Sequence, residues 1–222
     1  MDTRYYIESD GRIFLVPRDG RLDLPLPEEV PFAVEPMAPL PGGRTWFCTP
    51  HLAAHPNDWL SKDDVSTRND VSSLVREAVH ASMPRIVTEG ICIENGRVLL
   101  VKGNRGLTEG RWTLPGGFLR FGEHPCEGLR RELKEELGVD AKIHDLLAVR
   151  SKLGEHTCLH WILFFYRVSI ADAPVPNADE IAEVRFFDFE AARAAISDSV
   201  MCEVIAESTK NAGPSVTEDP SR

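Results

Sequence analysis

Hydrophobic and polar residues form blocks of strand and helix length from about residue 85 to residue 206. The blocks with the length and apolar character of β-strands cover residues 86–93, 98–102, 141–152, 157–168 and 184–187. Asn95-Gly96 joins the first two blocks and predicts a tight hairpin. A helix is predicted from Pro125 to Leu137, because proline suits a first turn and Gly138 follows directly. With Asp188 expected to cap a C-terminal helix, this succession predicts an α/β fold.

The first 84 residues follow a different pattern. Short strand-like segments and the turn pairs Asp10-Gly11 and Asp19-Gly20 predict a small β-meander up to about residue 24. Residues 25–64 are dense in proline and are expected to be irregular. Asp70 is expected to cap a linker helix at about residues 70–82. The predicted organisation is therefore a β-rich region at 1–84, a domain at 85–206 and a disordered polar tail at 207–222.

The sequence contains no pattern that predicts a membrane-spanning helix or secretion. The apolar stretch from Leu159 to Tyr166 is far shorter than the ~20 residues that span a bilayer, and the start of the chain has no secretory pattern. The chain has 5 cysteines, an odd number, and no pair has a CxxC spacing. A cytoplasmic protein with free thiols is the expectation.

The net charge of −10 argues against a protein that binds nucleic acid or an anionic membrane, because such binding depends on lysine and arginine. The first 84 residues alone hold 13 acidic and 8 basic residues, so a DNA-binding domain is not expected there. A phosphate-bearing substrate fits this charge if a divalent cation supplies the local positive charge.

The segment from Gly117 to Val139 carries the candidate chemistry. On a helix, Glu132 lies one turn before Glu135 and Glu136, so three carboxylates project from one side. Their mutual repulsion is relieved by a hard cation, and oxygen ligands are those that Mg²⁺ or Mn²⁺ prefers. Gly116 and Gly117 let the backbone approach such a cation closely, since neither has a Cβ.

This segment resembles the Nudix box of the Nudix hydrolase superfamily. It has the pattern Gly-x5-Glu-x7-Arg-Glu-U-x-Glu-Glu-x-Gly-U, where U is aliphatic, and the lead-in from Trp112 to Gly117 is similar to that of the family. The resemblance covers about residues 85–206. It implies an α/β/α sandwich with a mixed sheet, and Mg²⁺-dependent hydrolysis of a nucleoside diphosphate linked to another moiety, for example ADP-ribose or a nucleoside triphosphate.

The resemblance also implies residue roles. Metal ligands would be Glu132, Glu135 and Glu136 with a backbone carbonyl of Gly116 or Gly117, for Mg²⁺ with Mn²⁺ as a substitute. Glu123 and Arg131 would support them, and Arg131 is grouped with Glu132 and Glu135 as catalytic. The general base would be either a glutamate of the box or one on a loop beyond it, and the loop candidates here are Glu183 and Glu180, just before the strand at 184–187.

The substrate is harder to predict. Trp112 is a candidate for stacking on a base, and Arg120 and Arg111 are candidates for phosphate contacts; core packing and plain solvation are the alternatives. The proline typical of ADP-ribose pyrophosphatases is replaced by Gly154 and Glu155, and the tyrosine of diadenosine polyphosphate hydrolases by His156 and Thr157.

Other functions stay open at this point. One is a non-catalytic ligand sensor or regulator on the same scaffold, and another is an isomerase of isoprenoid diphosphates. Residues 1–84 are expected either to form a homodimer or cover the substrate, as an N-terminal β-region does in some pyrophosphatases of this superfamily, or to extend the sheet without a functional role.

Overall fold

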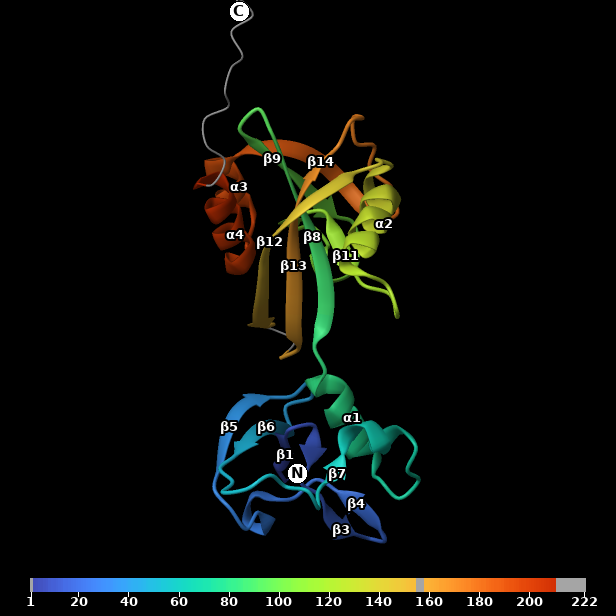
Figure 1. Ribbon diagram of the computed structural model, residues 1–222, viewed down its shortest axis with the longest axis vertical. Coiled ribbons are helices and arrows are strands. Elements are labelled where there is room, and N and C mark those ends of the chain that lie inside the picture. The colour runs from blue at the N-terminus through green and yellow to red at the C-terminus, as the bar shows by residue number, and fades with distance from the viewer. Residues whose placement is uncertain (1, 155–157, 211–222) are drawn as a thin grey trace, which may run out of the picture. The chain divides into compact units, whose positions relative to one another are not determined.

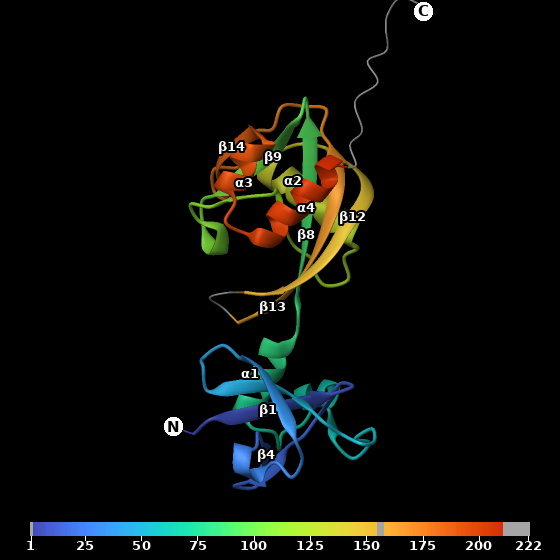
Figure 2. The same ribbon diagram turned by 90° about the vertical axis from the view of Figure 1, so that its left-hand side faces the viewer.

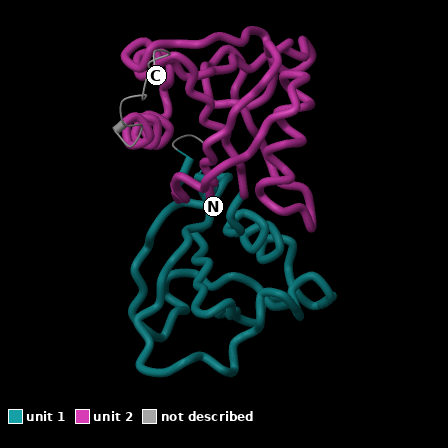
Figure 3. Tube along the Cα trace, turned by 45° about the horizontal axis from the view of Figure 1, so that its top comes forward, with its two compact units in different colours: residues 1–85, 153–161 teal, residues 86–152, 162–222 magenta. Residues whose placement is uncertain are grey.

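The computed structural model describes residues 2–154 and 158–210 (Figure 1). It divides into two compact units, residues 1–85 with 153–161 and residues 86–152 with 162–222 (Figure 3). The tail expected from residue 207 is helical through Lys210, and its part from residue 211 lies outside the described residues. Residues 155–157, which carry part of the absent substrate markers, also lie outside them.

The first unit is built on β-strands. A five-stranded sheet has the order β5-β6-β1-β2-β7, and β3 pairs with β4 alone. The strands are β1 (Arg4–Ser9), β2 (Arg12–Ile13), β3 (Val16–Arg18), β4 (Arg21–Asp23), β5 (Val34–Pro39), β6 (Thr45–Pro50) and β7 (Leu60–Ser61). Short 3₁₀ turns lie at η1 (Pro27–Glu29) and η2 (Lys62–Ser66). The expectation that residues 25–64 are irregular is therefore wrong for 34–39, 45–50 and 60–61, which form strands, whereas no strand forms at 25–33 or 51–59.

Edge position explains how a proline-rich segment forms a strand. β5 contains Pro36 and Pro39 and lies at the end of the sheet order, where it pairs only with β6 in that order. Proline lacks a backbone N–H, so it is tolerated on an edge strand, whose outer side needs no partner. A high density of proline therefore does not by itself predict an irregular segment in this chain.

Turns and the helix of this unit follow local chemistry. Asp10 and Asp19 have positive φ of 49° and 51°, as their pairing with glycine predicts. Helix α1 (Ser73–Ser82) is capped by Ser72, whose side chain accepts a hydrogen bond from the Val75 amide, and not by Asp70. Asp70 instead pairs with Arg68, which removes it from the cap. Side chains from the strands and α1 form the core of the unit: Tyr6, Ile13, Leu24, Leu40, Val65, Val71, Val75, Ala78 and Val79.

The second unit contains a seven-stranded sheet with the path β10-β9-β8-β13-β12, to which β11 adds on β8 and β14 on β9. Its strands are β8 (Arg85–Glu94), β9 (Arg97–Gly103), β10 (Trp112–Thr113), β11 (Gly116–Phe118), β12 (Lys142–Leu153), β13 (His160–Ser169) and β14 (Ile181–Asp188), with a 3₁₀ turn η3 (Gly106–Thr108). Asn95 and Gly96 both have positive φ and form the predicted hairpin between β8 and β9.

Helices cover both faces of this sheet. Helix α2 (Pro125–Leu137) lies on one side, and α3 (Phe189–Ala195) and α4 (Ser199–Lys210) lie on the other (Figures 1 and 2). The predicted C-terminal helix is therefore two helices, because Asp188 caps α3 and Asp198 accepts bonds from the first amides of α4. In the described part of the chain no helix is long and apolar enough to cross a membrane. The layers confirm the predicted α/β/α sandwich.

The face of α2 toward the sheet is apolar, as its sequence period predicts. Leu129, Leu133 and Leu137 are fully buried and belong to one core with Val101 and Tyr166. Full burial of a leucine side chain stabilises a fold by roughly 1.5–3 kcal/mol. The helix is thereby fixed on the sheet, and its charged side chains are held on the remaining faces.

Candidate functional site

The strand β11 and the residues that connect it to α2, here called the glycine loop, begin with Gly116 and Gly117, which approach other groups closely. Gly116 pairs with Glu89 of β8 and has a φ of 146°. A Cβ on Gly116 would lie 2.1 Å from the Thr88 carbonyl oxygen, and a Cβ on Gly117 would lie 2.7 Å from Cδ of Glu132. The Thr88 backbone therefore excludes a side chain at Gly116, and a Cβ at Gly117 would displace the Glu132 carboxylate, which lies directly beside the backbone.

Helix α2 begins at a defined cap. The His124 side chain accepts a hydrogen bond from the Cys126 amide, and the Glu127 carboxylate accepts one from the His124 amide. Pro125 occupies the first turn, and Gly138, with a φ of 69°, ends the helix. These local signals fix which turn carries the candidate carboxylates.

Arg131 connects the loop to the carboxylates of α2. Its Nε and Nη2 donate to the two oxygens of Glu123 at 2.7 and 2.8 Å. Its Nη1 donates to Glu132 Oε1 at 2.7 Å and to Glu135 Oε2 at 3.0 Å. Hydrogen bonds from Arg131 lower the pKa of Glu123 to about 2, so this carboxylate stays charged. The structure thus brings together the two predicted supporting residues and two of the predicted ligands.

The third predicted ligand, Glu136, is buried. Only 9% of its surface is exposed, and its Oε2 accepts a hydrogen bond from the Gly116 amide at 3.1 Å. Burial, with the nearby charges of Glu132, Glu180 and Glu135, raises the pKa of Glu136 to about 8. Burial also raises the pKa of Glu132. Burial thus favours the neutral form of these carboxyl groups, and a cation bound beside them would favour the charged form.

Glu135 and Arg120 lie at the outer side of this group. Glu135 Oε1 accepts a hydrogen bond from Arg120 Nη2 at 2.9 Å, and the two side chains are 42% and 64% exposed. An exposed ion pair of this kind contributes little to stability, about 0–1 kcal/mol. Arg120 can therefore exchange this partner for another anion at small cost.

Glu89 is a further buried carboxylate near the site, and the sequence did not predict it. It lies in the strand β8, is 5% exposed, and its Oε2 has no hydrogen-bond partner among the described residues. The signal in the sequence is a charged residue within the apolar run of residues 86–93. The local sequence pattern does not show that Gly116 and Glu136 lie near Glu89.

Within residues 2–154 and 158–210, no three histidine, cysteine, aspartate or glutamate side chains are arranged so that they could hold a metal ion. Arg131 and Arg120 hold the oxygens of Glu132 and Glu135 instead. The donor set still suits a hard divalent cation, because it consists of carboxylate oxygens and lies beside two glycines that leave space at the backbone.

The two candidates for the general base lie in different surroundings. Glu183 accepts a hydrogen bond from Lys102 at 3.1 Å and one from Arg185 at 3.0 Å, and the bond from Lys102 is the main reason why its pKa is lowered. Glu180 pairs with Arg105, and its charge raises the pKa values of Glu132 and Glu136. The structure therefore brings Glu180 into the electrostatic neighbourhood of the α2 carboxylates.

The predicted substrate contacts are spread out. Trp112 is half-buried, packs edge-on against Phe187 with ring centroids 4.8 Å apart, and has Lys102 and Arg185 over its ring at 5.9 and 5.5 Å. The Trp112 ring is therefore already in contact with protein side chains, and these contacts do not support the predicted stacking of a substrate base on it. Arg111 lies directly before β10 and is exposed. Its carbonyl accepts a hydrogen bond from the amide of Gly103, the last residue of β9.

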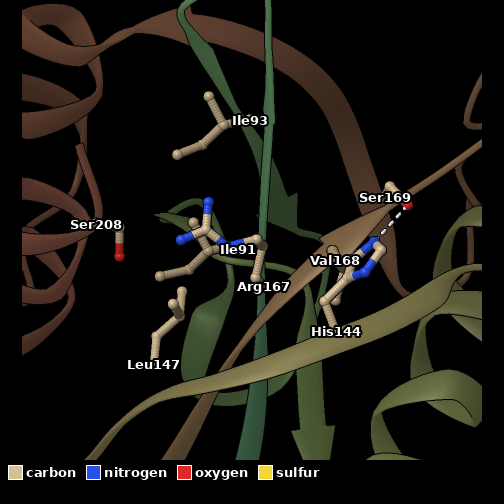
Figure 4. Close-up of a pocket in the computed structure, with 8 residues that line it drawn as sticks. All are labelled: Ile91, Ile93, His144, Leu147, Arg167, Val168, Ser169 and Ser208. Carbon is tan, nitrogen blue, oxygen red and sulfur yellow. Dashed lines mark hydrogen bonds between the residues drawn. The ribbon is translucent and has the colours of Figure 1, made fainter. Parts of the chain in front are cut away.

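A small pocket on the sheet lies apart from the α2 carboxylates. It has a volume of about 150 Å³, and α4 and the strands β8, β12 and β13 supply its walls (Figure 4). Its lining residues are Ile91, Ile93, His144, Leu147, Arg167, Val168, Ser169 and Ser208. His144 Nε2 lies 2.8 Å from Ser169 Oγ, but no residue of the Gly117–Val139 segment lines the pocket.

Comparison with known proteins agrees with the box. A family model described as NUDIX domain matches residues 84–205. The ADP-ribose pyrophosphatase of Methanocaldococcus jannaschii is 31% identical over 105 residues, which cover 47% of this chain and 62% of that protein. The nucleoside triphosphatase NudI of Enterobacter sp. (strain 638) is 45% identical over 56 residues, which cover 24% of this chain and 40% of that protein. The chain thus spans less than two thirds of the length of each of these relatives.

Among solved structures, the crystal structure of a NUDIX hydrolase from Nitrosomonas europaea is similar, with a TM-score of 0.51 and 24% identity. The match covers 79% of this chain and 86% of that one. At this identity the similarity shows the fold, and it agrees with the α/β/α sandwich described above.

Proposed function

The chain belongs to the NUDIX family, and from that premise we propose that it is a Mg²⁺-dependent pyrophosphohydrolase that cleaves a nucleoside diphosphate linked to another moiety. The observation that carries the proposal is the contact of the glycine loop with α2. Glu132 packs against Gly117, and Glu136 accepts a hydrogen bond from Gly116, so carboxylates and backbone converge on one place.

Three carboxylates would hold the cation: Glu132, Glu135 and Glu136, with a carbonyl of Gly116 or Gly117. Mg²⁺ fits their hard oxygen atoms, and Mn²⁺ is the expected substitute. When bound, the cation neutralises phosphate charge and lowers the pKa of an attacking water. It would compete with Arg131 and Arg120 for the oxygens that these arginines now hold.

The other residues position the reacting groups. Arg131, anchored by Glu123, orients Glu132 and Glu135 on their helix. Arg120 is exposed and pairs with Glu135, whose side chain is also exposed, so Arg120 can turn to a substrate phosphate. We assign the proton-accepting role to Glu180 rather than Glu183, because the charge of Glu180 acts on the α2 carboxylates.

The names of the relatives guide the choice of substrate. A relative named ADP-ribose pyrophosphatase makes ADP-ribose the first substrate to test, and one named nucleoside triphosphatase makes nucleoside triphosphates the second. Both substrates contain the nucleoside diphosphate group that the proposal requires. A homodimer through residues 1–84 and a cytoplasmic location stay predictions.

The test is hydrolysis of a panel that includes ADP-ribose, NADH, dinucleoside polyphosphates, sugar nucleotides and nucleoside triphosphates with Mg²⁺. Wild type should turn over at least one of them, and Glu136→Gln should reduce turnover by orders of magnitude. Glu127→Gln is the matched control, since this residue is exposed on the same helix and glutamine can still cap it. Tight ADP-ribose binding without any turnover would favour the sensor, and full activity after removal of all divalent cations would contradict the proposal.

A further inference from the structure

A buried carboxylate on β8 has no role in the function proposed above. Glu89 is 5% exposed, and its Oε2 has no hydrogen-bond partner in the described part of the chain. A buried polar atom without a hydrogen-bond partner destabilises the folded state, so such atoms are rare unless they bind something. Its position therefore requires an explanation.

The strand register places Glu89 beside the glycine loop. It pairs with Gly116 of β11, and a Cβ on Gly116 would lie 3.0 Å from the Glu89 Cα. The Gly116 amide in turn donates to Glu136 Oε2 at 3.1 Å. A single residue of β11 thus separates the backbone of Glu89 from the carboxylate of Glu136.

The charges around Glu89 are mainly negative. After burial, the charge of Glu136 is the largest cause that raises the pKa of Glu89, and Glu132 acts in the same direction. Lys152 acts in the opposite direction, but it pairs with Asp198 before α4. Arg131 of α2 pairs with Glu123, Glu132 and Glu135. Lys152 and Arg131 thus each have another carboxylate as an ion-pair partner in the described part of the chain.

From this placement we propose that Glu89 is an additional carboxylate ligand of the divalent-cation site, supplied by β8 beside the carboxylates of α2. The inference rests on the proposed function, because it assigns a further ligand to the same cation. The competing explanation is a protonated acid that only fills the interior next to the loop. The two differ in what Glu89→Gln does to cation binding, because glutamine keeps the size of the side chain and removes its charge.

Mn²⁺ alone is the probe, and its free concentration is measured by electron paramagnetic resonance during titration of the full-length protein. Glu89→Gln should weaken Mn²⁺ binding by about tenfold or more, in line with the effect of residues that tune a metal site. The melting temperature without metal should be unchanged or higher, since glutamine keeps the size of the side chain and removes a buried acidic group that lies among other carboxylates. The melting temperature gained on addition of Mn²⁺ should be smaller than in wild type.

Glu94→Gln, a carboxylate on the same strand, is the matched control and should bind Mn²⁺ as wild type does. Glu89→Asp keeps the charge but shortens the side chain, and it should weaken Mn²⁺ binding less than Glu89→Gln. If Glu89→Gln does not fold, Glu89→Ala decides, because it also removes the carboxylate, and wild-type affinity in that variant overturns the proposal.

Wild-type Mn²⁺ affinity in a folded Glu89→Gln protein also overturns it and leaves the proposed hydrolase intact. If wild type and Glu136→Gln bind Mn²⁺ equally weakly, the proposed function fails first, and the inference fails with it. Substrate turnover is not needed for either outcome.

Discussion

Gly117 lies so close to Glu132 that a Cβ at this position would be 2.7 Å from the carboxylate carbon and 2.9 Å from both of its oxygens. The Glu132 carboxylate therefore packs against the backbone of β11. A residue larger than glycine at position 117 would push this carboxylate away, whatever the turn geometry. This contact fixes where the Glu132 oxygens lie relative to the loop carbonyls, which is the relationship that a cation site at this place would need.

Gly117→Ala should therefore displace Glu132 without preventing folding. We expect turnover to fall by about tenfold to a hundredfold, the range found when a ligand loses its support, and Mn²⁺ binding to weaken in parallel. Gly90→Ala is the control, since a Cβ there would meet Val168 and Leu129 at 3.4–3.5 Å, which are ordinary contacts. The measurements are steady-state kinetics and melting temperature, and wild-type turnover in Gly117→Ala would show that the position of Glu132 is unimportant.

The bond between Arg131 and Glu123 predicts a dependence of stability on pH. The pKa of Glu123 in the folded protein is lowered to about 2 from 4.5. The stabilisation from this lowered pKa is complete above the unfolded value and is lost as the pH falls through the folded value. Wild type should therefore be more stable than Glu123→Gln at pH 7, and the difference should shrink between about pH 5 and pH 2.

Thermal unfolding of wild type, Glu123→Gln and Glu127→Gln across this pH range measures the effect. The control variant changes an exposed carboxylate on the same helix and should show a much smaller difference from wild type. A stability difference for Glu123→Gln that stays constant from pH 7 to pH 2 would mean that the charge of Glu123 does not support Arg131.

Much of the second unit could be predicted because its signals are local. The helix from Pro125 to Leu137 has a first-turn proline, an apolar period and a following glycine, and each signal acts within a few residues. The hairpin at Asn95-Gly96 is likewise determined by two residues that accept positive φ. Local signals failed for β5, where the edge position in a sheet decides whether proline is tolerated.

The parts of the site that could not be predicted depend on pairing between distant strands. Glu89 and Gly116 are far apart in sequence, and only the register of β8 with β11 brings them together. Ser72 rather than Asp70 caps α1, because Arg68 competes for the aspartate. Periodicity shows which face a residue occupies, but it does not show what lies opposite.

The two candidates for the general base, Glu180 and Glu183, are also distinguished by the pairing of distant strands. The register of β14 on β9 shifts between Ile181 and Glu183, and Glu183 lies opposite Lys102, which pairs with it. Glu180 precedes the strand, and its amide bonds to the Asn177 carbonyl. An irregularity in one strand thus separates two carboxylates that the sequence alone leaves equivalent.

Glu180→Gln should lower kcat by at least about a hundredfold, the lower range for loss of a general base, with little change in KM. Glu183→Gln should retain most of the activity, and any loss should appear as lower stability, because Lys102 and Arg185 lose their partner. The pH profile of kcat separates a proton acceptor from a residue that only holds Arg105: the limb on the acidic side should disappear in Glu180→Gln. A larger loss of kcat in Glu183→Gln than in Glu180→Gln would reverse the assignment and show that Glu183 leaves its two cations when substrate binds.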